Sequence, residues 1–289
     1  MNYIIFTLGV YDIISSIMKR NYDLIFGLGA ACSCTQTLRK AGLQLLSFPN
    51  DWCGPEDRYA SGEPILHDLC IRAEQLCTSF SGCFNPEDFK SCGVDPRNRF
   101  LVYRNVKTGC LFNHDIPNGS DFSAAFAEMT AKYRRRTDRI LKILSSAKDV
   151  LIVRLDRPDQ LTPTPLDDCR QARSLLSERF PGVRFDLILF SFEKGRSFED
   201  RLDEAIEDGL RRVTFDYKDP NPDSPPFQPA ISLTAAVLRE SYRVAEYRTK
   251  EEIAAGNQRE KLKRYAKFGA TNYLGYRLAR IKRALFGAT

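Results

Sequence analysis

The sequence predicts an α/β protein with a mostly parallel sheet, helices on both faces of that sheet and a basic amphipathic helix at the C-terminus. Between residues 150 and 217, short apolar runs alternate with segments of helical composition. Continuous apolar strands that alternate with helices indicate a parallel sheet covered on both faces. Near the N-terminus, an apolar run ends in glycines before a helical segment, which indicates the same architecture.

The first elements are expected in the order strand, glycine turn, helix. Residues 23–29 (DLIFGLG) are an apolar run that predicts a buried strand. Residues 36–41 have helical composition, and Gly42 follows as a C-cap. Cys32 then lies near the start of a helix. Leu43–Phe48 predicts a second strand or an extended segment that the following proline ends.

The middle of the chain changes from irregular to helical. Residues 53–98 are rich in Gly, Pro and Cys, with one helix expected at 64–76. Residues 100–103 and 109–112 predict a hairpin, and His114 follows its second strand directly.

Regular elements are expected from residue 122 onward. A long helix is predicted at 122–145, because apolar residues recur there at helical spacing: Phe122, Phe126, Met129, Tyr133, Ile140 and Leu144. The remaining predicted elements are a strand at 150–153, a helix at 165–179, a strand at 185–190, a helix at 198–210, a strand at 212–217 and a helix at 231–247.

Length and composition limit the kind of protein this is. A chain of 289 residues can bury one sizeable core. Nine cysteines, an odd number, and the lack of an export signal predict reduced thiols in the cytoplasm. Four segments are expected: an apolar extension at 1–20, an α/β domain at 21–220, a proline-rich linker at 221–230 and a helical basic tail at 231–289.

Several classes of site lack their signatures. The chain has only two histidines and no pair of CxxC elements, so neither a structural zinc site nor any other metal site is predicted. Gly27 and Gly29 lack the third glycine of a dinucleotide fingerprint, and neither a phosphate loop nor a GxSxG elbow occurs. No cofactor is therefore expected.

Cys32 is the candidate nucleophile. The free N–H groups at a helix N-terminus stabilise a thiolate, and the glycine turn lets backbone amides approach a substrate carbonyl. The alternative is that Cys32 packs as a small apolar residue where the helix meets the sheet.

His114 is the candidate base, since a neutral imidazole can take the thiol proton and a neighbouring carboxylate can fix its tautomer. The alternative is a surface histidine beside a turn carboxylate. His67, inside a predicted helix, is the poorer candidate.

These residues belong to a set of motifs that resembles a bacterial domain-of-unknown-function family known as papain-like cysteine peptidases. The resemblance covers residues 22–155 and rests on segments in the following order: Tyr22–Cys32, Leu38–Leu43, Ser47–Trp52, Tyr103–Gly109, Phe112–Ile116 and Tyr133–Arg135. The family has a glycine-turn cysteine, a Pro-Phe-Asp-Trp motif, a His-Asp-Phe element and a Tyr-x-Arg-Arg element.

The resemblance implies a Cys–His pair at Cys32 and His114, with a carboxylate assistant at Asp51 or Asp115. Asn50 stands where the family has phenylalanine, which leaves that wall of the pocket undefined. Cys34 is also close to the turn, but the spacing from the glycines favours Cys32. The candidate substrate-binding residues are Gly29, Ser33, Trp52, Arg134, Arg135 and Asp156.

Asp156 and the arginines have alternative interpretations. Asp156 ends a predicted strand, where open α/β sheets place ligand-binding groups, but it can equally be a loop carboxylate paired with Arg157. Arg134 and Arg135 can contact an anionic group or form part of a solvated helix face.

The tail carries the basic charge of the chain. Nine basic residues and one acidic residue lie between Arg259 and Arg283, whereas the whole chain has a net charge of +6. Apolar residues on one helical face, with basic and aromatic residues around them, predict binding to an anionic membrane surface, peripheral at the inner membrane. A helix packed on its own domain is the alternative, and nucleic acid is disfavoured as a partner because no recognition fold accompanies the charge.

Three functional hypotheses follow. The first is a cysteine-dependent hydrolase or acyl transferase acting on a peptide or glycan-linked substrate. The second is a transferase or accessory protein of bacterial surface polysaccharide (lipopolysaccharide or capsule) assembly without cysteine chemistry, and the third is a non-catalytic binding module. The second predicts that Cys32→Ser leaves function intact.

Overall fold

The structure, a computed structural model, describes residues 19–54, 68–95, 98–156, 163–194, 201–217 and 227–245. Residues 1–245 group into one compact unit, and residues 246–289 form a second. Every helix and strand named below lies in the first unit. The predicted N-terminal extension, up to residue 18, and the basic tail at 259–283 lie outside the described residues.

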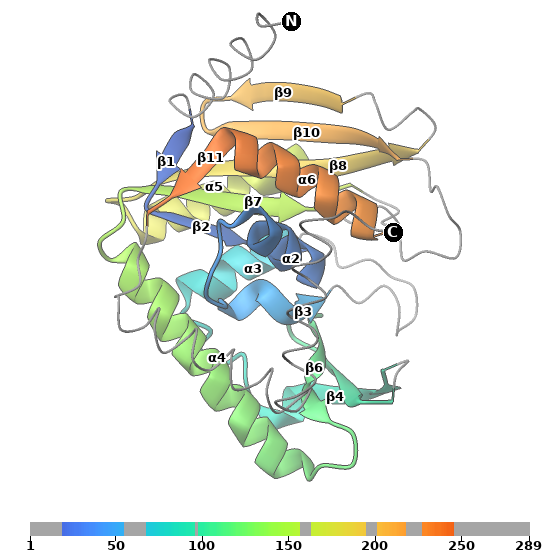
Figure 1. The fold of residues 1–289 in the computed structure, drawn as a ribbon. Coiled ribbons are helices and arrows are strands. Elements are labelled where there is room, and N and C mark those ends of the chain that lie inside the picture. The colour runs from blue at the N-terminus through green and yellow to red at the C-terminus, as the bar shows by residue number, and fades with distance from the viewer. Residues whose placement is uncertain are drawn as a thin grey trace, which may run out of the picture. The chain divides into compact units, whose positions relative to one another are not determined.

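A five-stranded sheet with the order β2-β7-β8-β10-β9 forms the centre of the first unit (Figure 1). Its strands are β2 (Leu24–Gly27), β7 (Asp149–Leu155), β8 (Arg184–Lys194), β10 (Leu210–Tyr217) and β9 (Arg201–Glu207). The first four run parallel, and β9 pairs with β10 in the antiparallel direction. The predicted α/β class is confirmed, with a mixed sheet.

Helices cover both faces of this sheet (Figure 1). One face carries α2 (Cys32–Ala41) and α6 (Phe227–Ser241), and the other carries α3 (Asp68–Cys77) and α5 (Leu166–Arg179). The hydroxyls of Thr37 and Thr234, 3.1 Å apart, join α2 to α6 inside the core. Next to this sheet, β1 (Arg20–Tyr22) and β11 (Tyr242–Val244) pair in parallel.

A second, antiparallel sheet has the order β3-β6-β5-β4. Its strands are β3 (Cys53–Gly54), β6 (Leu111–Pro117), β5 (Phe100–Asn105) and β4 (Phe89–Val94). The long helix α4 (Phe122–Leu144) packs against it, and Asp121 caps the helix by accepting a hydrogen bond from the N–H of Ala124. The predicted hairpin and long helix are confirmed, whereas β4 was not predicted.

Aromatic side chains fill the space between α4 and the antiparallel sheet. Tyr133 is fully buried, and its ring centroid lies 5.5 Å from that of Phe112. Phe89 contacts both Phe112 and Phe126. This second core fixes the position of β6, which carries His114.

The helix predicted at 198–210 is wrong. The described part of the segment, residues 201–210, forms β9 and a tight turn into β10, with Gly209 at a φ of +70°. Glu204 and Ile206 are half-buried between exposed neighbours, which is the alternation of a strand. The Asp208–Gly209 pair between the strands is the hairpin signal that decides the structure over helical composition.

Two local predictions also need correction. Leu43–Phe48 forms no strand, so of its two predicted forms only the extended segment remains, and it leads into a 3-10 helix, η1 (Pro49–Trp52). His114 does not follow the second strand of the hairpin but lies inside it, because β6 extends to Pro117. Gly42 does end α2, with a φ of +77°, as predicted for a C-cap.

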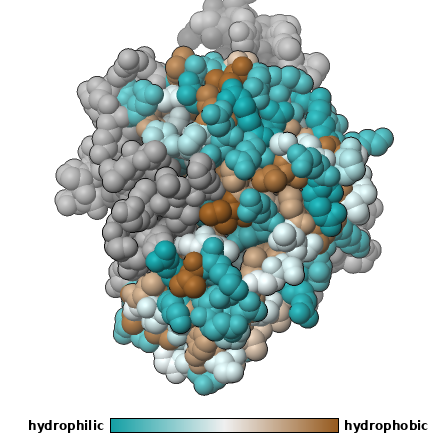
Figure 2. All heavy atoms as spheres, turned by 180° about the vertical axis from the view of Figure 1, so that it is seen from behind, coloured by the Kyte–Doolittle hydropathy of each residue, from teal (hydrophilic) through white to brown (hydrophobic). Residues whose placement is uncertain are grey.

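The surface of the described residues is largely polar on the face that Figure 2 shows. On the face drawn in Figure 2, apolar side chains form small separate groups among hydrophilic ones. Among the described residues, the exposed large hydrophobic side chains come from four different segments: Leu45, Val94, Val106 and Leu202. Among the described helices, none is both long and apolar enough to cross a membrane.

Candidate functional site

Cys32 is the first residue of α2. Residues 28–31 connect it to β2, so the predicted order of strand, glycine turn and helix is confirmed. Ala31 at the N-cap provides no side-chain cap, and no acidic residue occupies the first turn. The Cys32 thiol is partly exposed, and Nε2 of Gln36 donates to its sulfur at 3.8 Å. The sulfur thus belongs to the first turn of α2, whose N–H groups are not capped by a side chain.

Cys34 has a different environment, although it lies in the same helical turn. Its side chain is 1% exposed, and its thiol donates to the carbonyl of Val153 at 3.3 Å. Burial raises the pKa of Cys34 to about 12. The accessible thiol at the start of α2 is therefore Cys32, which agrees with the choice made from the glycine spacing.

Two buried arginines hold the turn that precedes Cys32. Nη1 of Arg154 donates to the carbonyl of Leu28 at 3.0 Å, and Nη2 of Arg72 donates to the carbonyl of Ala30 at 3.2 Å. Gly29 lies between these carbonyls with a φ of +93°. A Cβ at Gly29 would lie 2.8 Å from Nε of Arg72 and 2.9 Å from Nη1 of Arg154, so only glycine fits there.

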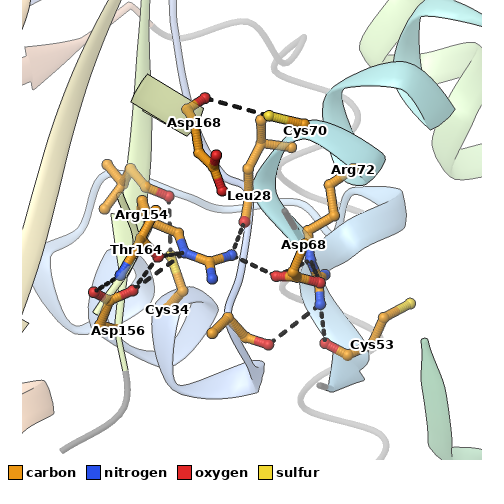
Figure 3. A network of polar contacts seen from close by, with 12 residues as sticks. Leu28, Cys34, Cys53, Asp68, Cys70, Arg72, Arg154, Asp156, Thr164 and Asp168 are labelled. Atoms are coloured by element: carbon orange, nitrogen blue, oxygen red, sulfur yellow. Dashed lines mark hydrogen bonds and ion pairs between the residues drawn. The ribbon is translucent and has the colours of Figure 1, made fainter. Parts of the chain in front are cut away.

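The arginines are part of a buried network of ion pairs that joins α3 to β7 (Figure 3). Asp68 of α3 bonds Arg72 at 2.8 Å and Arg154 at 2.6 Å. Asp156 accepts from the backbone N–H of Thr164 at 2.9 Å and pairs with Arg154 at 3.4 Å. Two guanidinium groups thus meet two carboxylates, which balances the buried charge.

The pKa shifts in this network follow from burial and pairing. Burial opposes ionisation of Asp68, but Arg72 and Arg154 outweigh it and hold the pKa of Asp68 below its usual value. The pKa of Asp156 is raised, because its burial outweighs the charge of Arg154. Asp68 is therefore the securely ionised partner of the two arginines.

The sequence prediction identified only Asp156 in this network. Asp156 is 2% exposed and its carboxylate pairs with Arg154, whereas Arg157 lies outside the described residues. One signal was available: Arg154 interrupts the apolar run VLIV of β7, and a charged residue inside a buried strand needs a partner. The i, i+4 spacing of Asp68 and Arg72 on α3 was a second signal.

Asp51 lies beside the first turn of α2. Its backbone carbonyl accepts a hydrogen bond from the hydroxyl of Thr35 at 3.1 Å. Its carboxylate accepts from Nε2 of Gln44 at 2.7 Å and from the backbone N–H of Phe48 at 2.8 Å. Burial raises the pKa of Asp51, and these hydrogen bonds oppose the shift. The contacts of this carboxylate are thus made within the segment 44–51.

His114 lies in an irregular part of β6. Leu101 pairs with Ile116 and Tyr103 with Phe112, so residues 113–115 stand opposite a single residue of β5. Bulges of this kind redirect side chains and are frequent beside active sites. The ring of His114 makes an edge contact with Phe100, at 6.1 Å between centroids.

The surroundings of His114 favour its neutral imidazole near pH 7. Burial lowers the pKa of His114, and the positive charge of Arg99 acts in the same direction, while Asp115 opposes the shift. A neutral imidazole is the form that accepts a proton from a thiol. The described neighbours of His114 include Phe100, Asp115 and Arg99, whereas a described contact of the Cys32 sulfur is with Gln36. The pairing of Cys32 with His114 therefore stays a prediction.

Asp115 connects β6 to α4. Its carboxylate forms an ion pair with Lys132 and accepts a hydrogen bond from the Tyr133 hydroxyl at 3.2 Å. The same hydroxyl lies 3.5 Å from the Cys53 sulfur. Asp115 therefore anchors the strand that carries His114.

The other predicted site residues are dispersed. Ser33, in the first turn of α2, is buried, and its hydroxyl oxygen has no hydrogen-bond partner. Trp52 ends η1, and its side chain lies outside the described part of the structure. Arg134 and Arg135 are exposed on α4, and Arg134 lines a pocket that is described below. Within the described residues, no group of three or more His, Cys, Asp or Glu side chains is placed to hold a metal ion.

Comparison with known proteins found a relative that is similar in sequence to part of this chain. It is 28% identical over 154 residues to "Uncharacterized protein R408" of Acanthamoeba polyphaga mimivirus, an alignment that covers 51% of this chain and 69% of that protein. No family model and no solved structure matches the chain.

Proposed function

We propose that the chain is a cysteine-dependent hydrolase or acyl transferase that uses Cys32 as its nucleophile. The observation that supports this most directly is a partly exposed thiol at the uncapped N-terminus of α2, after a turn whose carbonyls are held by buried arginines. A helix N-terminus lowers the pKa of a thiol and supplies amides for an oxyanion. The papain-like resemblance of the motifs agrees with this role.

The turn also suggests how the oxyanion would be stabilised. The carbonyls of Leu28 and Ala30 accept from Arg154 and Arg72, and that of Gly29 accepts from the N–H of Leu155 at 3.1 Å. With these carbonyls directed into the protein, amides at the start of α2 are available to a substrate oxygen. Arg72 and Arg154 are positioning residues in this proposal, because they act through the turn.

The reaction would proceed by acyl transfer. His114 accepts the Cys32 proton, and the thiolate attacks the carbonyl carbon of an amide, ester or thioester, forming a C–S bond and an oxyanion. The oxyanion collapses, the bond to the leaving group breaks, and His114 returns the proton to that group. Water then cleaves the C–S bond in a hydrolase, whereas another nucleophile does so in a transferase.

The test measures the rate at which iodoacetamide labels each cysteine as a function of pH, with mass spectrometry as the readout. Cys92, a partly exposed thiol on β4, is the internal reference. Cys32 should react faster than Cys92 and remain reactive below the free-thiol pKa of about 8.5. His114→Ala should slow Cys32 near neutral pH and leave Cys92 unchanged.

Equal labelling of Cys32 and Cys92, unaffected by the His114 substitution, would contradict the proposal. If Cys32 is labelled rapidly and His114→Ala does not change the rate, Cys32 remains the proposed nucleophile but His114 is not its base.

A further inference from the structure

A hollow between α4 and the loop after α3 lies apart from the residues of the proposed site. The loop, residues 79–85, forms one wall, and one face of α4 between Thr130 and Leu141 forms the other. The volume is about 480 Å³, within the range of pockets that hold small molecules. Neither Cys32 nor His114 lines it, so a role for this pocket is independent of the cysteine chemistry.

The helical wall carries two charges without ion pairs. Arg134 and Asp138 lie one turn apart and both are exposed. Neither makes an ion pair within the described residues, whereas Lys132 pairs with Asp115 and Arg139 donates to the carbonyl of Ser47 at 2.7 Å. The charged groups of Arg134 and Asp138 are therefore available to a ligand in the pocket.

The loop wall adds neutral polar groups in a defined backbone. Ser79 has a φ of +55° and Gly82 one of +69°, which gives the loop its tight course. The side-chain amide of Asn85 donates to the carbonyl of Gly82 at 3.3 Å and to Asp88 at 3.2 Å, so its own oxygen is left to accept. The exposed serines at 79 and 81 contribute hydroxyls.

Apolar side chains complete the lining. Phe84 is half-buried, and its ring lies 5.0 Å from that of Tyr133, which fixes its orientation. Leu141 lies on the helical wall. The pocket therefore combines a cation, an anion, hydroxyls, an amide oxygen and apolar surface.

This combination selects among ligand classes. A phosphate ion would be attracted by Arg134 but repelled by Asp138, and a purely apolar ligand would desolvate both charges without pairing them. A sugar ring has hydroxyls that donate to Asp138 and Asn85, C–H groups that pack on Phe84, and room for a carboxylate that pairs with the Arg134 guanidinium. We propose that the pocket binds a saccharide unit that carries a carboxylate, such as a uronic acid.

The test is titration of the full chain with glucuronate, glucose and inorganic phosphate, monitored by saturation-transfer NMR. Glucuronate should bind saturably and more tightly than glucose or phosphate. Arg134→Gln should weaken glucuronate binding about tenfold, the loss of one charge-assisted contact. Arg135→Gln is the matched control, since Arg135 is the next exposed arginine of α4 but does not line the pocket.

Three results would overturn the proposal: no saturable glucuronate binding at millimolar concentrations, phosphate binding as tight as that of glucuronate, or equal weakening in the Arg134 and Arg135 variants. Cys32→Ser should leave glucuronate binding unchanged, because the pocket does not include Cys32.

Discussion

At the scale of single residues, the turn before Cys32 depends on a position where a side chain cannot fit. Gly29 has a positive φ, and the guanidinium groups of Arg72 and Arg154 occupy the space where its Cβ would be. Both arginines are buried and paired, so neither can move away without breaking an ion pair. The conformation of the turn and the charge network beneath it are therefore coupled.

Gly29→Ala should destabilise the protein by roughly 3 kcal/mol or more, because backbone strain is joined by displacement of a buried arginine. The measurement is urea unfolding followed by circular dichroism. Gly119→Ala is the control: Gly119 also has a positive φ, of +80°, but no atom lies within 4 Å of its added Cβ. The Gly119→Ala variant should lose only about 1–2 kcal/mol of unfolding free energy, the cost of the left-handed backbone. Equal losses in the two variants would show that the arginines do not restrict position 29.

The candidate nucleophile was accessible to sequence reasoning because its signals are local. Cys32 follows an apolar strand and a glycine turn within ten residues, and those patterns specify the start of a helix. The partners of the turn are not local: Arg154 is 126 residues from Leu28, and Arg72 is 42 residues from Ala30. Nothing in the spacing of the sequence links these positions.

At the scale of elements, the ion-pair network connects α3, β7 and the turn after β2. Asp68 is its central member, because it contacts both arginines. Since pairing holds the pKa of Asp68 below its unfolded value, its ionisation stabilises the fold above that value, near pH 4. This stabilisation is lost as the pH falls through the folded-state pKa.

Asp68→Asn should destabilise the protein by about 3–5 kcal/mol at pH 7, because two buried guanidinium groups then share one carboxylate. The difference from the parent should shrink as the pH falls below about 4, because unfolding of the parent is then favoured by proton uptake at Asp68. Urea unfolding at several pH values measures both effects. Asp167→Asn is the control, because the exposed pair of Asp167 with Arg170 contributes little. A constant difference at all pH values would show that the charge of Asp68 is not the stabilising feature.

Element prediction succeeded where one signal dominated and failed where two competed. The 23 residues of α4 have a consistent apolar stripe and a capping aspartate, so the predicted range was correct to within one residue. In residues 198–210, helical composition competed with an Asp-Gly turn signal at 208–209. The partner strand β10 favours the strand, and its contribution is not visible in the segment itself.

At the scale of the whole molecule, the alternation of strands and helices predicted the parallel part of the sheet and its two helical layers. The antiparallel sheet was predicted only as one hairpin, because its outer strands are short or polar. β3 has two residues, and β4 (FKSCGV) lacks an apolar run. The proposed site draws on both sheets, so its geometry depends on how distant segments meet.

The basic residues of the chain are concentrated in its C-terminal tail, and this predicts that the tail binds an anionic membrane surface. Nine basic residues between Arg259 and Arg283 meet a single acidic one, with aromatic residues among them. Replacing Arg277, Arg280 and Arg283 with glutamine should weaken binding to vesicles rich in phosphatidylglycerol by about 3 kcal/mol, at about 1 kcal/mol per charge. Sedimentation of the full chain with vesicles, at low and high salt, measures this.

The control for that prediction removes three exposed lysines from the first compact unit: Lys90, Lys142 and Lys148. Both variants lose the same net charge, so any difference between them reports where the membrane-binding charge lies. Because exposed charges are screened, binding of the parent should fall as salt rises. Equal weakening in the two variants would indicate attraction by net charge alone, and vesicle binding that neither variant changes would exclude an electrostatic role for the tail.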